Sequence, residues 1–159
     1  MDKKTIFTGL GGIVAGAILM GVFGFLSAPA AMITESESNF SHEETVELII
    51  ETAEEMDWKI PATHNIHNSV ASGGWDVEKV TVIELCNVDL AGDILTGDEN
   101  RIVSSMMPCR VAVYETSDGR VIVSRMNTGL MSSVFGGKVQ EVMSMATDET
   151  EIILGSVIN

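Results

Sequence analysis

Two cysteines are the residues of this sequence best suited to chemistry. Cys86 ends a run of β-branched residues, and Cys109 begins the next such run after a helical stretch. Antiparallel pairing of the two strands would put the thiols within disulfide range, whereas parallel pairing would put them at opposite ends of the sheet. An even number of cysteines in a domain outside the cytoplasm favours a disulfide. Two inert buried thiols and a functional thiol pair are the alternatives.

Methionines gather around the second cysteine. Met106 and Met107 precede Pro108 and Cys109, and four more follow at Met126, Met131, Met143 and Met145. Thiolate and thioether ligands select Cu(I) over harder ions. The spacing His64-x-x-His67 adds two imidazoles, which makes these histidines weak candidates for metal ligands beside the two cysteines. Methionine more often fills cores, so core packing is the alternative to a metal site.

No catalytic constellation is visible. The sequence contains no Gly-x-Ser-x-Gly elbow, no phosphate-binding Gly-x-x-x-x-Gly-Lys, no His-Glu-x-x-His and no Cys-x-x-Cys. A cysteine nucleophile needs a partner base, and the histidines are His42, His64 and His67. We expect His42 to face solvent because it lies in a helix-capping sequence. We therefore assign no catalytic residue, cofactor or enzymatic activity.

The N-terminal segment has the length and composition of a membrane helix. Thr5 to Thr34 are thirty residues without an ionisable side chain, and the stretch from Ile6 to Leu26 is predominantly apolar. About 20 apolar residues suffice to cross a bilayer as a helix. Lysines precede the stretch and carboxylates follow it, which predicts a cytoplasmic N-terminus and an outer domain over residues 34–159.

Two interpretations of this segment remain. Residues 1–33 form an uncleaved signal-anchor in the first, which we favour because the apolar run exceeds the 7–15 residues typical of a signal peptide. In the second, the small-x-small sequence Ala28-Pro29-Ala30 is a cleavage site, and cleavage near Ala30 releases a secreted domain. Both interpretations place residues 34–159 outside the cytoplasm, with the membrane as a partner in the first.

Composition excludes several classes of protein. The chain of 159 residues carries a net charge of -14, which argues against binding to nucleic acid. A hydrophobic share of 45% excludes a wholly disordered chain. The length allows one domain of ordinary size. This composition is compatible with a small ligand or a protein partner. It gives no information on the oligomeric state.

The order of the predicted elements indicates a small single α+β domain. Ser41-x-x-Glu44 is a capping box that begins an amphipathic helix. Asp118-Gly119 between two β-branched runs predicts a hairpin. The remaining predictions are strands over residues 33–38 and 80–86, a strand start at 58–60, and helices over 65–71, 89–95 and from 138 onward. Mixed elements with an antiparallel hairpin favour a mostly antiparallel sheet packed by helices.

Three strings carry a resemblance to a known family. They are Val82-Ile-Glu-Leu-Cys-Asn87, Ser104-Ser-Met-Met-Pro-Cys-Arg-Val-Ala-Val113 and Ser124-Arg-Met-Asn-Thr-Gly-Leu-Met131, extended by Phe135-Gly-Gly137 and Glu141-Val-Met143. In their order they resemble the "domain of unknown function 302" family, and within it the membrane-anchored members with Glu-Leu-Cys and Met-Pro-Cys motifs. The resemblance covers nearly all of residues 33–159.

The resemblance implies a fold and a patch, with no activity. It implies a small α+β domain with a sheet like that of the TATA-binding protein, packed by helices. The residues that it makes the most plausible ligand or redox patch are Cys86, Cys109, Met107, Pro108, Met126 and Asn127. The leading hypothesis is a binding module that holds a small ligand, a soft metal or a redox partner at this patch. The alternatives are a structural protein with a Cys86–Cys109 staple and a thiol redox carrier.

Overall fold

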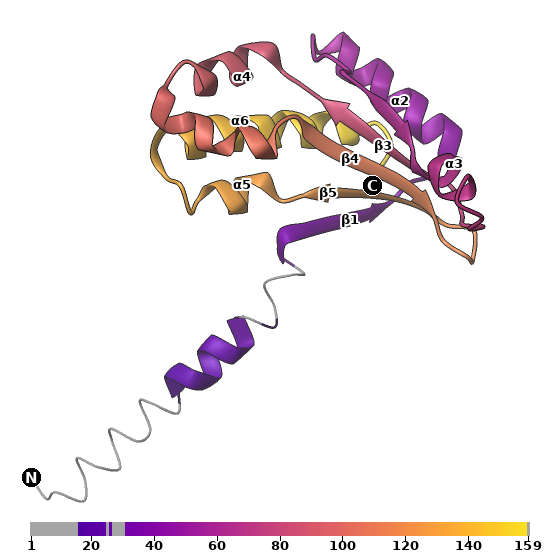
Figure 1. Cartoon of the computed structure of the whole chain (residues 1–159), viewed down its shortest axis with the longest axis horizontal. Helices are drawn as coiled ribbons and strands as arrows, with labels where there is room; N and C mark the ends of the chain where they lie inside the picture. The colour runs from indigo at the N-terminus through magenta and orange to yellow at the C-terminus, as the bar shows by residue number, and fades with distance from the viewer. Residues whose placement is uncertain (1–15, 25, 27–30, 159) are drawn as a thin grey trace, which may run out of the picture. The chain divides into compact units, whose positions relative to one another are not determined.

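The computed structural model describes residues 16–24, 26 and 31–158 (Figure 1). The chain divides into two compact units, Met1–Met32 and Ile33–Asn159. In the first unit, residues 16–24 are helical. Within the described residues, no helix combines the length and the apolar character that crossing a membrane requires.

The prediction of an N-terminal transmembrane helix from Ile6 to Leu26 is therefore wrong for the part of the chain that the structure describes. Residues 16–24 and 26 of the predicted span are helical, but the described residues contain no helix long and apolar enough to cross a bilayer. Residues 6–15 and 25 of the predicted helix lie outside the described residues, as does the predicted cleavage site at 28–30.

The second unit, as far as it is described, is an α+β domain on a five-stranded antiparallel sheet with strand order β1-β5-β4-β3-β2 (Figure 1). The strands are β1 (Ile33–Glu37), β2 (Thr63–Asn65), β3 (Val80–Leu85), β4 (Cys109–Glu115) and β5 (Val121–Met126). All four neighbouring pairs run antiparallel. The predicted α+β class and antiparallel sheet are confirmed.

Helices lie in every connection between the strands except the β4–β5 hairpin, and two more helices follow β5. They are α2 (His42–Glu55), α3 (Ile66–Ala71), α4 (Val88–Leu95), the 3₁₀ helix η1 (Asp98–Met106), α5 (Thr128–Ser132) and α6 (Gly137–Leu154). Figure 1 shows α4 and α5 at the same end of the sheet, beside α6, and both contact that helix. The helical excursion between the two cysteine strands therefore packs on α6.

Two local predictions are confirmed in detail. Ser41 caps α2 with a complete capping box, in which its side chain accepts from the Glu44 amide and the Glu44 carboxylate accepts from the Ser41 amide. The β4–β5 hairpin turns at Gly119, whose φ of 86° lies in the left-handed region that glycine adopts without strain.

The prediction that His42 faces solvent is wrong, because the side chain is 4% exposed. His42 is the first residue of α2, and it lies on the buried side of that helix with Thr45, Ile49 and Ala53. These positions recur at intervals of three and four, so they share one helix face. The capping sequence fixes where the helix begins but does not determine which side of it meets the sheet.

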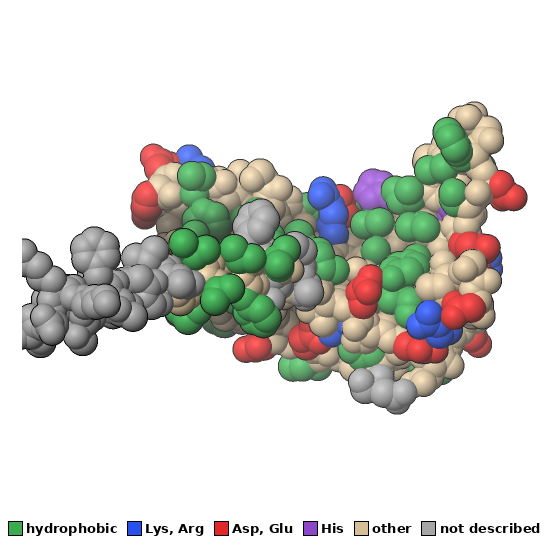
Figure 2. All heavy atoms as spheres, turned by 90° about the horizontal axis from the view of Figure 1, so that it is seen from below, with side chains coloured by type: hydrophobic (Ala, Val, Ile, Leu, Met, Phe, Trp, Pro, Cys, Tyr) green, Lys and Arg blue, Asp and Glu red, His purple; other side chains and the backbone are tan. Residues whose placement is uncertain are grey.

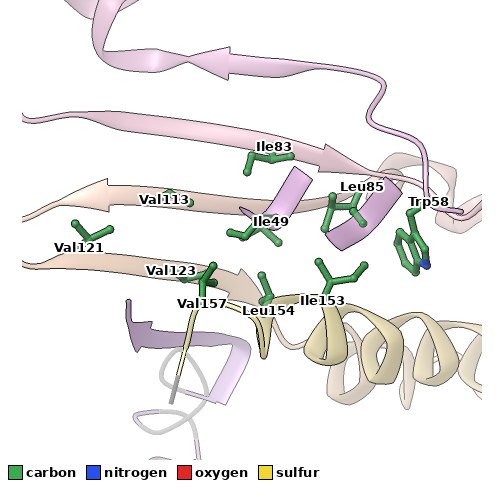
Figure 3. Close-up of a cluster of buried hydrophobic side chains, with 12 residues drawn as sticks. Ile49, Trp58, Ile83, Leu85, Val113, Val121, Val123, Ile153, Leu154 and Val157 are labelled. Atoms are coloured by element: carbon green, nitrogen blue, oxygen red, sulfur yellow. The ribbon is translucent and has the colours of Figure 1, made fainter. Parts of the chain in front are cut away.

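One face of the sheet carries the core. Alternate side chains of β3 and β4 are fully buried, among them Ile83, Leu85 and Val113. Figure 3 shows Ile153 and Leu154 of α6 pointing at these strands. Both α2 and α6 contribute to this cluster, so the two helices cover the same face of the sheet.

A partly buried ion pair links α6 to the sheet. Arg125 of β5 is 8% exposed and donates from Nε and Nη2 to the two carboxylate oxygens of Glu151, at 2.8 and 2.7 Å. Its Nη1 donates to Ser36 Oγ of β1 at 2.9 Å. Bidentate geometry of this kind fixes orientation as well as adding energy. These contacts therefore fix the positions of α6 and β1 relative to β5.

Acidic side chains are widely distributed over the surface. Figure 2 shows Asp and Glu spread over one side of the molecule, several of them next to Lys or Arg. Pairs such as Lys79–Glu43 and Lys138–Asp93 are exposed and contribute little to stability. The excess of carboxylates makes this surface attractive to cations in general.

Neighbouring isoleucines on α6 provide a test of this core. Ile153 is 0% and Ile152 is 63% exposed. We expect Ile153→Ala to lower the free energy of unfolding by about 2–5 kcal/mol because it leaves a cavity between α6 and the sheet. The matched Ile152→Ala should change it by less than about 0.5 kcal/mol. Urea denaturation followed by circular dichroism measures both, and equal losses would contradict this packing.

Candidate functional site

The register of β3 and β4 brings the two cysteines together. Leu85 lies directly opposite Cys109, and Cys86 follows as the next residue of the chain. The Cys86 backbone pairs with Lys59 through two hydrogen bonds of 2.8 and 2.9 Å, which holds the end of β3 in place. Both cysteines are half-buried free thiols. The antiparallel arrangement considered for the cysteine strands is the one that the structure adopts.

A partly open apolar cavity of about 40 Å³ lies beside these thiols. Five of its lining residues carry sulfur: Cys86, Cys109, Met106, Met107 and Met143. Its other walls include Trp58 from the segment after α2, Leu90 and Ile94 from α4, and Val142 from α6. We refer to this space as the sulfur-lined cavity.

Burial controls the chemistry of the thiols. It raises the pKa of Cys109, and the neighbouring Cys86 raises it further, because a thiolate is disfavoured in an apolar place and next to another thiol that ionises. Cys109 is therefore a protonated thiol at neutral pH. A nucleophilic or redox-active cysteine normally has the opposite property, a lowered pKa.

A carboxylate of α6 holds two of the cavity walls. Glu149 Oε2 accepts from Trp58 Nε1 at 2.8 Å and from Asn87 Nδ2 at 3.0 Å. Asn87 in turn caps α4, since its Oδ1 accepts from the amides of Asp89 and Leu90. The indole and the start of α4 are therefore fixed relative to α6, and the cavity between them is preformed.

The structure separates the residues of the predicted patch into two groups. Met107 and Pro108, joined by a cis peptide bond, line the sulfur-lined cavity with both cysteines. Met126 lines a different cavity of about 10 Å³, which shares Cys109 with the first. Asn127 caps α5, where its Oδ1 accepts from the Leu130 amide at 3.0 Å.

The two histidines considered as metal ligands lie away from the cysteines. His64 Nε2 is 3.4 Å from Glu84 Oε1, and His67 Nδ1 contacts the Val80 backbone. Neither lines the sulfur-lined cavity. Within the described residues, no group of three or more His, Cys, Asp or Glu side chains is arranged to hold a metal ion. A metal in the cavity would depend on thiols and thioethers.

Several residues of the site do not stand out in the sequence. Trp58 and Glu149 lie 91 positions apart, and no local pattern predicts their hydrogen bond. The sequence predicts Met143 as a core residue of a helix. It is buried in the structure, and it also lines the sulfur-lined cavity. Asn87 has a local signal, because Asn directly before an apolar helical stretch is a common N-cap.

Comparison with known proteins identifies the domain. The family model described as "Domain of unknown function DUF302" matches residues 34–157. Among solved structures, the crystal structure of the uncharacterized conserved protein DUF302 from Bacillus stearothermophilus is similar, with a TM-score of 0.71 and 16% sequence identity over 79% of this chain and 97% of that chain. No curated protein matches. At this identity the structural likeness shows the fold alone.

The raised pKa of Cys109 predicts slow alkylation. In the reduced full chain, we expect iodoacetamide to label Cys109 at pH 7 at least about tenfold more slowly than N-acetylcysteine, because the protonated, half-buried thiol is unreactive. Labelling should accelerate only above the usual thiol range near pH 8.5. Mass spectrometry of the peptides separates the two cysteines, and the chain in urea serves as the control. Rapid labelling of Cys109 below pH 7 would show a lowered pKa instead.

Proposed function

This chain belongs to the DUF302 domain family, and we propose that it is a binding module whose site is the sulfur-lined cavity. The observation that carries the proposal is the gathering of two neighbouring free thiols and three thioethers around one small apolar cavity. The ligand that this space suits best is a soft monovalent metal ion, Cu(I) in particular.

Size supports an ion rather than an organic molecule. Ligand pockets for organic molecules generally measure about 300–1,000 Å³, and the sulfur-lined cavity measures about 40 Å³. A space of this size accommodates a single ion with its ligands around it.

The ligand chemistry favours Cu(I) among metal ions. Zn²⁺ prefers four ligands drawn from thiolate, imidazole and carboxylate, and the cavity offers two cysteines without a histidine or a carboxylate. Cu(I) accepts thiolate and thioether sulfur. When the ion binds, Cys86 and Cys109 each release a proton, and Met106, Met107 or Met143 supplies a neutral ligand. The release of protons makes the affinity rise with pH.

Two other functions use the same pair of thiols. A thiol redox carrier is less well supported because the pKa of Cys109 is raised rather than lowered. A disulfide staple is supported by the closeness of the two cysteines, and the predicted location outside the cytoplasm, which stays a prediction, would favour it. The oxidation state of the purified chain distinguishes the staple from the metal site.

Titration with Cu(I) tests the proposal. We expect the reduced full chain, under anaerobic conditions and against a chromophoric Cu(I) chelator, to bind one equivalent with ultraviolet absorption typical of copper–thiolate bonds. Cys86→Ser and Cys109→Ser should each abolish binding. Met106→Leu should weaken it about tenfold, equivalent to about 1.4 kcal/mol.

Met145→Leu is the matched control, because Met145 is 46% exposed and does not line the cavity. It should leave the affinity unchanged, and circular dichroism verifies that each variant is folded. A reduced, folded chain that fails to compete with the chelator would contradict the metal site. A native mass two units low, with thiols that resist alkylation, would establish the disulfide staple instead.

A further inference from the structure

A buried histidine lies between α2 and the sheet. His42 is the first residue of α2 and is 4% exposed. It lies on the helix face that carries Thr45, Ile49 and Ala53, which are all buried. Neither ring nitrogen is accessible to solvent, and among the described residues neither has a hydrogen-bond partner. A buried polar group without a partner is rare and requires an explanation.

Four ionisable side chains surround the ring, each from a different segment. Glu43 Oε1 of α2 lies 4.0 Å from Nδ1 of His42, too far for a hydrogen bond. His67 of α3 makes only an edge-on ring contact, with centroids 6.3 Å apart. Lys79, which precedes β3, and Glu115 of β4 act on the ring through their charges. None of these four side chains gives the imidazole a hydrogen-bond partner.

Lys79 engages both carboxylates that a charged imidazole would need. Its Nζ donates to Glu43 Oε1 at 2.6 Å and lies 3.3 Å from Glu115 Oε1. Burial lowers the pKa of His42, Glu43 and Glu115 offset that effect only in part, and Lys79 lowers the pKa again. The Val113 backbone raises it least, since it approaches the ring without normal hydrogen-bond geometry. The folded chain therefore holds the ring in its neutral form at pH 7.

A proton on His42 is incompatible with this packing. A buried charge is costly in free energy unless it is paired and hydrogen-bonded. Because solvent does not reach the ring nitrogens in the docked helix, a proton arrives only when the start of α2 moves off the sheet. The charge is hydrated only in the displaced position, so the proton then keeps the helix there. Uptake of the proton and displacement of the helix are therefore linked.

From this geometry we propose that His42 is an acid-sensitive latch, whose protonation releases the start of α2 from the sheet. Above pH 6.5, the ordinary pKa of histidine, the ring is mostly neutral in every state of the chain and the helix stays docked. As the pH falls below that value, the displaced state takes up a proton that the docked state excludes. The stability that the neutral ring provides is lost over this range, because the pKa in the docked state is the lower one.

Amide hydrogen exchange of the full chain tests where the structure opens. Between pH 7 and pH 5, after correction for intrinsic exchange rates, we expect protection of α2 to fall about tenfold more than protection of α6. An undocked helix of 14 residues is barely stable by itself. His42→Phe keeps a ring that takes up no proton, and it should abolish this difference. His64→Gln removes an exposed histidine that contacts Glu84, and this matched control should behave like the unaltered chain.

Lys79→Met tests the cause of the acid sensitivity. It frees Glu43 and Glu115 to pair with a charged imidazole, so the docked helix should tolerate a proton on His42 and its protection should depend less on pH. In an NMR titration of the imidazole resonances, we expect the pKa of His42 to be higher than in the unaltered chain. Lys138→Met removes a similarly exposed lysine from α6 and should leave the titration unchanged.

Four results would overturn the latch. They are equal losses of protection in α2 and α6, an unchanged pH dependence in His42→Phe, an unchanged titration of His42 in Lys79→Met, and titration of His42 at pH 6.5 or above in the unaltered chain while α2 stays protected. The last measurement needs no substitution, so it decides the question even when His42→Phe does not fold. None of these measurements involves Cys86 or Cys109, so they are independent of the metal site proposed above.

Discussion

The pairing of β3 with β4 is the constraint on which both the core and the candidate site depend. The register sets Ile83 opposite Val111 and Leu85 opposite Cys109. A shift by one residue would turn every side chain of β3 to the other face, which would expose Ile83 and Leu85 and separate the two thiols. The same hydrophobic burial that fixes the register therefore also brings the cysteines together.

Helix α6 completes the walls of the candidate site. Its carboxylates reach three separate parts of the domain, because Glu149 holds Trp58 and Asn87 while Glu151 holds Arg125. These contacts join residues 26 to 91 positions apart, so they form only when the sheet and the helices are already in place. The cavity walls are fixed by hydrogen bonds made outside the cavity, which leaves its interior apolar.

Sequence alone predicts the parts of this structure that depend on neighbouring residues. The capping box at Ser41 and the turn at Gly119 are local, and both are confirmed. The short β2 and the 3₁₀ helix η1 have no clear pattern, since each is held by residues distant along the chain. The burial of His42 does have a signal in the sequence. The helical period places His42 on the same face of α2 as Thr45, and that face is buried.

The candidate site also contains residues that the sequence predicts and residues that only the tertiary structure reveals. Both cysteines, with Met107 and Pro108, follow from two strand ends that antiparallel pairing brings together. Trp58 could not be assigned to the cavity, because its place depends on a hydrogen bond to a residue near the other end of the domain. The separation of Met126 from the cavity also depends on tertiary structure, because β5 pairs with β4 on the side away from β3.

The sulfur-lined cavity would select its ligand by the chemistry of its side chains, and the acidic surface makes such selection necessary. A surface rich in carboxylates attracts cations of every kind, and hard cations bind carboxylate oxygen readily. A site lined by sulfur and apolar groups reduces this competition, since only a soft ion gains from thiolate and thioether sulfur. On this argument partial burial of the two thiols matters, because a fully exposed sulfur pair would be hydrated and would discriminate poorly.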